Sequence, residues 1–254
     1  MENALPGGGV SPFVRRLAQI SPLSPAEITI LGELQWNTRT VRRSSDITTE
    51  GRSEGSFFIV MEGSAMRYRT LRDGRRQIIN LIFPGDIIGI TGSANENSLY
   101  PKSKALTPLV VSVVPFAKVN NLFNIHPQLI TKIFWLFSCD SAIYAEHLVD
   151  LGRRNAIERV AHFFLELLTR LEGVGLAEHQ SYVVPLTQKL IADALGLTVS
   201  HVNRVLRRLR LDGLAVLEDQ RVTVKDRTAL GDLADFDAGY LSRLSGAELL
   251  GGVA

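Results

Sequence analysis

Arginines and helix-capping residues occur together in the C-terminal third of the chain, in a pattern typical of DNA binding. Thr187 and Thr198 are of a type that caps helix N-termini, and Gly196 lies between them, where a left-handed backbone would end the first helix. The pattern predicts helices over 188–195 and 199–211, joined by a tight turn. This arrangement is a helix-turn-helix, in which the second helix enters the DNA major groove.

The second predicted helix carries side chains suited to that role. Its apolar residues repeat at helical spacing, and no acidic residue occurs from Ala194 through Leu211. Arginine presents a planar fork that matches guanine or a phosphate. We expect the early exposed residues to contact base edges, namely Val199, Ser200, His201, Asn203 and Arg204. We expect the later arginines to contact phosphates, namely Arg207, Arg208 and Arg210.

Two short apolar segments, 215–217 and 222–224, follow around a turn and predict the wing of a winged helix-turn-helix. The same outline occurs in proteins that do not bind DNA, and an arginine-rich face is often only solvated. The alternative function is therefore a regulatory protein that binds a cyclic nucleotide or another small ligand and uses this motif for protein contacts. The acid-free helix favours DNA.

Residues 40–115 have a different sequence pattern, in which short apolar runs are separated by turn residues. This pattern is typical of a β-sandwich, roll or barrel. Asp73-Gly74 predicts a tight hairpin turn within it. The block contains no histidine, which excludes a cupin-type metal enzyme, and no phosphate loop or nucleophile elbow occurs. We therefore expect no catalytic residue, no metal and no enzymatic activity. Upstream, Ser24-Pro25-Ala26-Glu27 predicts a helix start.

A long helix is predicted over 127–151, with apolar character on two sides. One row follows alternating steps of four and three, the seam of a coiled coil: Ile130, Phe134, Phe137, Ser141, Tyr144, Leu148 and Leu151. A second row lies beside it: Leu129, Ile133, Leu136 and Ile143. One row would face the β block and the other a second copy, which predicts a homodimer. The alternative is a single core helix that is packed all round.

Composition places the chain among ordinary globular proteins. It has 254 residues, 45% of them hydrophobic and 21% charged, with a net charge of +2. The single cysteine, Cys139, excludes an intrachain disulfide and a cysteine-based metal site, which fits a reducing compartment. No apolar run is long enough to span a bilayer and no secretory signal is recognisable. We expect a cytoplasmic protein with no membrane partner.

The order of predicted elements resembles the Crp/Fnr (catabolite activator/Fnr) family of bacterial transcription regulators. The sequence motifs are similar to those of the rhizobial-type members. The motifs that show the resemblance are FPGDIIG at 83–89, LGRR at 151–154, AIERVA at 156–161 and the string from Pro185 to Leu214. The resemblance implies an α+β chain with a jelly-roll β-barrel sensor domain, a long dimerisation helix and a C-terminal winged helix-turn-helix. The expected domains are a flexible arm over 1–12, a cyclic-nucleotide-binding-like β-roll over 13–126, the dimerisation helix over 127–152, the winged helix-turn-helix over 153–230 and a tail over 231–254.

The resemblance also implies roles for residues of the DNA-binding motif. Arg204 matches the family's recognition-helix arginine, which pairs with guanine, and Val199, Ser200 and His201 match its variable base-reading positions. Gln188 and Lys189, with Thr187 before them, match positions near the DNA backbone. The implied partners are a near-palindromic double-stranded DNA operator, a second copy of the chain and, for an activator, RNA polymerase.

The residues that bind the ligand in cyclic-AMP-binding members of the family are not present at the matching positions of this sequence. Ile90 stands where those members have a glutamate, residues 97–102 lack their Arg-Ser pair, and Tyr144-Ala145 replaces the Thr-Ser pair that touches adenine. We therefore expect no control by cyclic AMP and no cofactor, with an effector that is unknown or absent. A candidate effector pocket would include Ile90, Tyr100 and Lys102.

Overall fold

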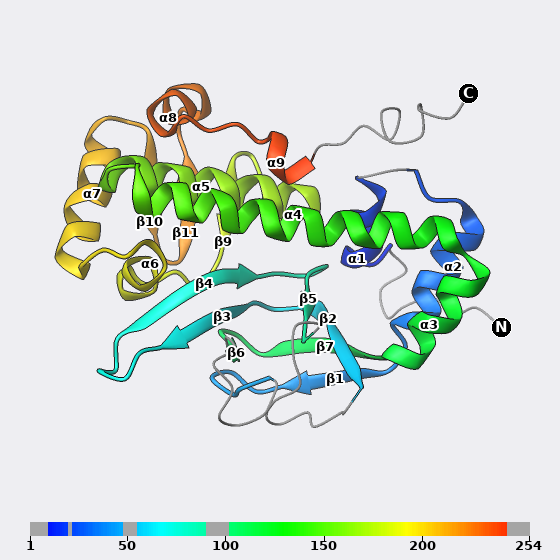
Figure 1. The fold of residues 1–254 in the computed structure, drawn as a ribbon. Helices are drawn as coiled ribbons and strands as arrows, with labels where there is room; N and C mark the ends of the chain where they lie inside the picture. The colour runs from blue at the N-terminus through cyan, green and yellow to red at the C-terminus, as the bar shows by residue number, and fades with distance from the viewer. Residues whose placement is uncertain (1–9, 20–21, 48–54, 90–101, 243–254) are drawn as a thin grey trace. The chain divides into compact units, whose positions relative to one another are not determined.

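The computed structural model describes residues 10–19, 22–47, 55–89 and 102–242. Within these residues the chain combines helices with three β-sheets, so the predicted α+β class is confirmed (Figure 1). No helix in the described part is both long and apolar enough to cross a bilayer.

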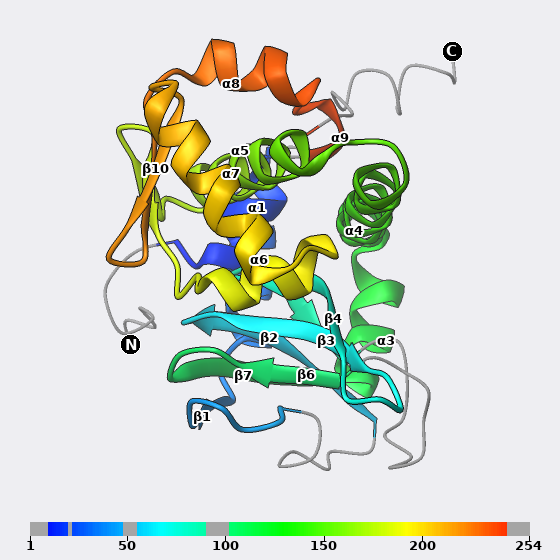
Figure 2. The same ribbon diagram turned by 90° about the vertical axis from the view of Figure 1, so that its left-hand side faces the viewer.

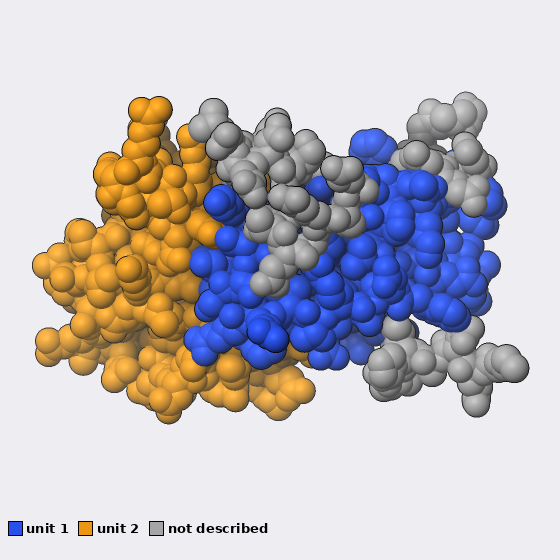
Figure 3. Space-filling view, turned by 90° about the horizontal axis from the view of Figure 1, so that it is seen from below, with its two compact units in different colours: residues 1–67, 81–138, 243–254 blue, residues 68–80, 139–242 orange. Residues whose placement is uncertain are grey.

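The described residues form two compact units (Figure 3). One contains the residues up to 67 together with 81–138, and the other contains 68–80 and 139–242. The predicted domains follow chain order, whereas the units do not, because the tip of one hairpin belongs with the C-terminal part of the chain. The domain boundaries given above stay a prediction.

The described residues of 12–125 form antiparallel strands and three helices, and of these, residues 68–80 belong to the second unit. The order in one sheet is β1-β7-β2-β5, and in the other it is β4-β3-β6. Two short strands, β1 and β6, and the helix α3 were not predicted. The two strands consist largely of polar residues, and α3 has no side-chain cap at its start. The elements are α1 (Pro12–Ala18), α2 (Pro25–Leu34), β1 (Thr38–Val41), β2 (Ser56–Glu62), β3 (Ala65–Thr70), β4 (Arg76–Ile82), β5 (Ile87–Ile88), β6 (Lys102–Ala105), β7 (Leu109–Pro115) and α3 (Phe116–Ile125).

The start of α2 is held as its sequence predicts. The Ser24 hydroxyl accepts from the Glu27 N–H, and the Glu27 carboxylate accepts from the Ser24 N–H, which completes a capping box. Lys132 of the long helix lies 3.0 Å from the Glu27 carboxylate and ties α2 to it. The helix start predicted at Ser24 is therefore confirmed.

The long helix α4 (Pro127–Gly152) has one buried and one exposed apolar row. Leu129, Leu136 and Ile143 are buried, and the first two belong to the core formed with α1, α2 and the strands. Phe134 and Leu148 of the predicted seam are 67% and 72% exposed. The helix therefore packs on its own chain along the second predicted row and leaves much of the first row uncovered.

The second unit is a helical domain with a small antiparallel sheet of order β10-β11-β9-β8. Helix α5 starts at a capping box formed by Asn155 and Glu158. At the far end, Phe236 and Tyr240 contact the ring of His162 on α5, so this part of the predicted tail packs back. The elements are α5 (Ala156–Gly173), β8 (Ala177–Glu178), β9 (Ser181–Val183), α6 (Gln188–Leu195), α7 (Val199–Leu211), β10 (Ala215–Glu218), β11 (Arg221–Val224), α8 (Arg227–Ala234) and α9 (Gly239–Ser242).

A buried carboxylate joins four segments of this unit. Glu166 of α5 is 1% exposed and lies 2.9 Å from His147 Nε2 of α4 and 3.2 Å from Arg170 Nη1. The Tyr240 hydroxyl donates to the same carboxylate at 3.2 Å. His147 Nδ1 lies 3.0 Å from the Ile79 carbonyl oxygen of β4. Because a buried charge must be paired, these contacts fix α4, α5, the end of β4 and the tail together.

The two titrating partners shift in opposite directions. Burial alone would lower the pKa of His147, but the charge of Glu166, its hydrogen bond and the Ile79 carbonyl outweigh burial and raise that pKa. Burial alone would raise the pKa of Glu166, but His147 and Arg170 lower it to about 2. The raised pKa of His147 stabilises the fold fully below the unfolded value of about 6.5, and this contribution disappears as the pH rises through the folded value.

Replacing His147 with glutamine should therefore remove a pH dependence. We expect the unfolding free energy of the wild type to fall as the pH rises from about 6.5 through the raised folded pKa of His147, and that of His147→Gln to stay flatter. Urea unfolding at several pH values measures this. His201→Gln, at an exposed position of α7, is the control and should follow the wild type. Parallel profiles for wild type and His147→Gln would contradict the assignment.

Candidate DNA-binding site

Helices α6 and α7 form the predicted helix-turn-helix, with the predicted bounds (Figure 2). The Thr187 hydroxyl caps α6 by accepting from the Leu190 N–H, and the Thr198 hydroxyl caps α7 by accepting from the His201 N–H. Gly196 ends α6 in the left-handed conformation, with φ of 64° and ψ of 33°. The turn is therefore produced by side-chain caps and one glycine, as the sequence predicts.

One face of α7 is buried and the other is open. Val202, Val205 and Leu209 point into the unit, where they are buried. All five predicted base-reading residues are exposed, namely Val199, Ser200, His201, Asn203 and Arg204. A helix held by its apolar side in this way presents the opposite side to a groove.

The four arginines of α7 are not equivalent. Arg208 lies 2.6 Å from Asp212, and Arg210 lies 3.1 Å from Glu218. Neither Arg204 nor Arg207 has an ion pair or side-chain hydrogen bond with any residue that the structure describes. Exposed ion pairs are weak, so a phosphate can displace them, but Arg204 and Arg207 are available at no such cost. Arg208 and Asp212 are four residues apart in the sequence, a spacing that favours an ion pair on a helix.

The start of α6 presents the other predicted backbone contacts. Thr187 and Lys189 are exposed, and Gln188 is half-buried. The first turn of α6 contains no acidic residue. A helix N-terminus has a partial positive charge and free N–H groups, so this end of α6 favours a phosphate.

The wing is a two-strand hairpin beside the motif. Strands β10 and β11 pair antiparallel from Ala215 with Val224 to Glu218 with Arg221. The two turn residues, Asp219 and Gln220, have φ of 48° and 63°. Positive φ at both central positions is the pattern of a type I′ turn, which matches the twist of a hairpin.

Arg159 at the start of α5 connects the motif to the end of α4. Its guanidinium donates to the carbonyl oxygens of Arg154 at 2.7 Å, Leu151 at 3.1 Å and Leu195 at 3.2 Å. Leu195 is the last residue of α6, so one side chain fixes the helix-turn-helix against the junction between α4 and α5. Arg159 lies within the AIERVA motif at 156–161, but nothing in the sequence alone indicates its role.

Comparison with known proteins identifies the family. The profile of a Crp-like helix-turn-helix domain matches residues 158–233, and that of a cyclic nucleotide-binding domain matches 38–126. The nitrogen fixation regulation protein FixK of Bradyrhizobium diazoefficiens is 33% identical over 229 residues, which are 87% of this chain and 91% of that protein. The chain belongs to the Crp/Fnr family of transcription regulators. It is a DNA-binding transcription regulator and resembles the rhizobial-type members.

Two further Crp/Fnr proteins support this placement. The transcriptional activatory protein AadR of Rhodopseudomonas palustris is 29% identical, over 87% of this chain and 90% of that protein. The solved structure of FixK2 from Bradyrhizobium japonicum superposes with a TM-score of 0.67 at 27% identity, covering 80% of this chain and 98% of that one. The likeness thus extends over both domains that the family shares.

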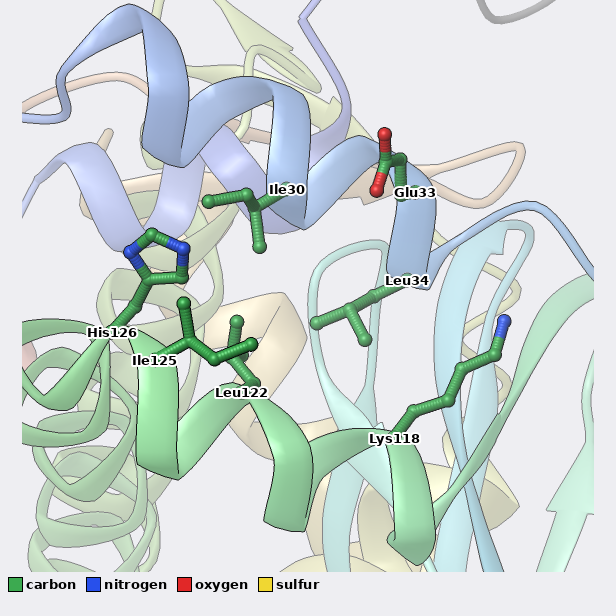
Figure 4. A pocket seen from close by; sticks show the side chains of 7 residues that line it. All are labelled: Ile30, Glu33, Leu34, Lys118, Leu122, Ile125 and His126. Atoms are coloured by element: carbon green, nitrogen blue, oxygen red, sulfur yellow. The ribbon is translucent and has the colours of Figure 1, made fainter.

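The predicted effector pocket of this Crp/Fnr chain is only partly visible. Ile90 and Tyr100 lie outside the described residues, and Lys102 is exposed on β6. A hollow of about 320 Å³ lies elsewhere in the first unit, between α2 and α3 (Figure 4). It contains none of the predicted pocket residues and is lined by Ile30, Glu33, Leu34, Lys118, Leu122, Ile125 and His126.

Substitution of Gly196 tests the turn of the motif. A side chain there must adopt a left-handed backbone, and its Cβ would lie 3.1 Å from Leu151 Cδ2. We expect Gly196→Ala to lower the unfolding free energy by about 1–2 kcal/mol. Gly213→Ala is the matched control, because Gly213 has φ of 71° but nothing within 4 Å of the added Cβ. Thermal unfolding that ranks Gly213→Ala as the more damaging would contradict a close approach at Gly196.

Proposed function

We propose that this regulator binds a near-palindromic operator as a homodimer, with the exposed face of α7 in the major groove. The observation that supports the proposal is the pair of uncommitted arginines on that face, Arg204 and Arg207. In this proposal Arg204 pairs with a guanine, and Val199, Ser200, His201 and Asn203 contact neighbouring base edges. Arg207, Arg208 and Arg210 bind phosphates together with Thr187, Gln188 and Lys189.

The homodimer rests on the exposed row of α4. Phe134, Leu148 and Leu151 are large apolar side chains that no described residue covers fully, and they recur at coiled-coil spacing. Pairing of two α4 helices along this row would produce a twofold axis. Two α7 helices would then meet successive major grooves about 34–36 Å apart, which explains the expected palindrome. Ile130, Phe137, Ser141 and Tyr144 complete the proposed seam.

The proposed activity is binding without catalysis, and it takes place in the cytoplasm, where operator DNA lies. Cyclic AMP is not the proposed effector, because Ile90 and Tyr144-Ala145 replace the ligand residues of cyclic-AMP-binding members. The relatives named above include a transcriptional activatory protein, and for an activator RNA polymerase is the further partner. The domain limits proposed for this chain remain 13–126, 127–152 and 153–230.

Alanine at Arg204 should relax sequence preference. The experiment selects an operator from random duplexes with the wild-type protein and then measures binding to every single-base variant. Arg204→Ala should lose about 1–3 kcal/mol of discrimination at one base pair of each half-site. Arg207→Ala, the matched control, should weaken binding to all variants alike and flatten the salt dependence. An unchanged preference profile for Arg204→Ala would overturn the base-reading assignment.

Aspartate on the exposed row of α4 should prevent dimerisation. Phe134→Asp and Leu148→Asp each put a charge at both sides of the proposed seam, and each should cost about 2 kcal/mol or more of association free energy. Analytical ultracentrifugation measures the dimer dissociation. Leu176→Asp is the control, since Leu176 is 47% exposed in a loop of the second unit and is not part of the proposed seam. If a seam variant dissociates at the same protein concentration as the Leu176→Asp control, the row on α4 is not the dimer interface.

A further inference from the structure

The tip of the hairpin formed by β3 and β4 is attached to the helix-turn-helix. Arg76 donates from Nε and Nη2 to one Asp193 carboxylate oxygen of α6, at 2.9 and 2.6 Å. Gln77 donates from its side-chain amide to the Ala194 carbonyl oxygen at 2.9 Å. Two neighbouring hairpin residues thus bind two neighbouring residues near the end of α6, and both partners belong to the second compact unit.

The base of the same hairpin tip is held by the buried cluster. His147 contacts the Ile79 carbonyl oxygen, and Arg170 Nη1 donates to the Asn80 side-chain oxygen at 2.9 Å. Asn80 is itself buried. With contacts to α4, α5 and α6, the hairpin tip is positioned by the same unit that carries α7.

This hairpin tip is strongly basic. Residues 69–76 contain four arginines, one aspartate and one large apolar residue, Leu71. Arg76 is occupied by Asp193, and Arg75 lies 2.7 Å from Asp73 in an exposed pair. Arg69 and Arg72 are exposed and form no ion pair or side-chain hydrogen bond with any described residue. Two cations without an ion pair among the described residues therefore remain at this turn.

The turn of the hairpin and α7 face the same side of the second unit. In Figure 1 both lie at the left-hand edge, and in Figure 2, seen from that edge, both face the viewer with α6 between them. The hairpin and α7 therefore lie on either side of α6, and the hairpin is bound near the end of α6.

We propose that this hairpin is a second DNA-contact site, in which Arg69 and Arg72 bind phosphates that flank the base pairs read by α7. The proposal rests on the proposed function, because it requires α7 to lie in the major groove. DNA fits better than a protein partner for two reasons. The site is made of guanidinium groups around a single exposed leucine, whereas protein interfaces have an apolar centre. It is also bound directly to α6, which crosses the DNA backbone in this motif.

The test is an equilibrium titration of Arg69→Ser/Arg72→Ser against the operator selected above, extended by about one helical turn of flanking DNA on each side, at several salt concentrations. Loss of two phosphate contacts in each protomer, four per dimer, should reduce the salt slope by about 3.6 and weaken binding by roughly tenfold or more at moderate salt, with base preference unchanged. The matched control is Arg42→Ser/Arg43→Ser, which removes the same charge from exposed positions of the first unit. The control should keep the wild-type slope and affinity.

Duplex length adds a second, independent readout. One duplex holds only the selected operator, and another extends it by about one helical turn on each side. The hairpin variant should differ from wild type on the extended duplex and much less on the short one, because the lost contacts lie on flanking DNA. Thermal unfolding of both double variants verifies that they are folded.

The outcomes separate the two proposals. If Arg204→Ala loses discrimination while the hairpin variant matches its control in slope and affinity, the hairpin proposal is wrong and the proposed function stands. If the hairpin variant binds DNA like its control but fails to activate RNA polymerase in transcription reactions, the basic turn contacts protein, which also overturns the proposal. If the wild type selects no operator, both proposals fail.

Discussion

The buried charge of Glu166 is the constraint on which the second unit depends. An isolated carboxylate cannot be buried without a large cost in free energy, so its partners must arrive together. They come from α4, α5 and the tail, while His147 and Arg170 in turn hold Ile79 and Asn80 of the hairpin. Removing one partner would leave this buried charge less well compensated. This explains why a hairpin from the β-roll region belongs to the unit that carries the DNA-binding motif.

The DNA-binding motif itself depends mainly on short-range interactions. Two threonine caps and one left-handed glycine define both helices and the turn, and the apolar side of α7 is buried in the unit. Arg159 adds the long-range element, since its three carbonyl contacts join the end of α6 to the end of α4. Loss of these contacts would therefore release the end of α6 from the junction between α4 and α5.

The same physical logic distinguishes arginines that hold the structure from arginines that remain available. Arg76, Arg159 and Arg170 are part-buried and fully engaged with carboxylates or carbonyl oxygens. Arg204, Arg207, Arg69 and Arg72 lie at the surface with no described partner. Charge alone does not separate these two groups. The separation depends on which carboxylates and carbonyl groups the fold brings within reach.

The sequence by itself determined the elements whose signals are local. The helix-turn-helix bounds, the capping box at Ser24 and the two-sided character of α4 follow from caps, glycine and periodicity, which act within a few residues. Only the tertiary structure decided which arginines are free, that Arg159 bridges two helix ends, and that residues 68–80 join the C-terminal unit. These features arise from contacts between residues up to 117 positions apart, such as Arg76 with Asp193. Such pairings are not encoded in local spacing, because they depend on how buried polar groups find partners once the chain is compact.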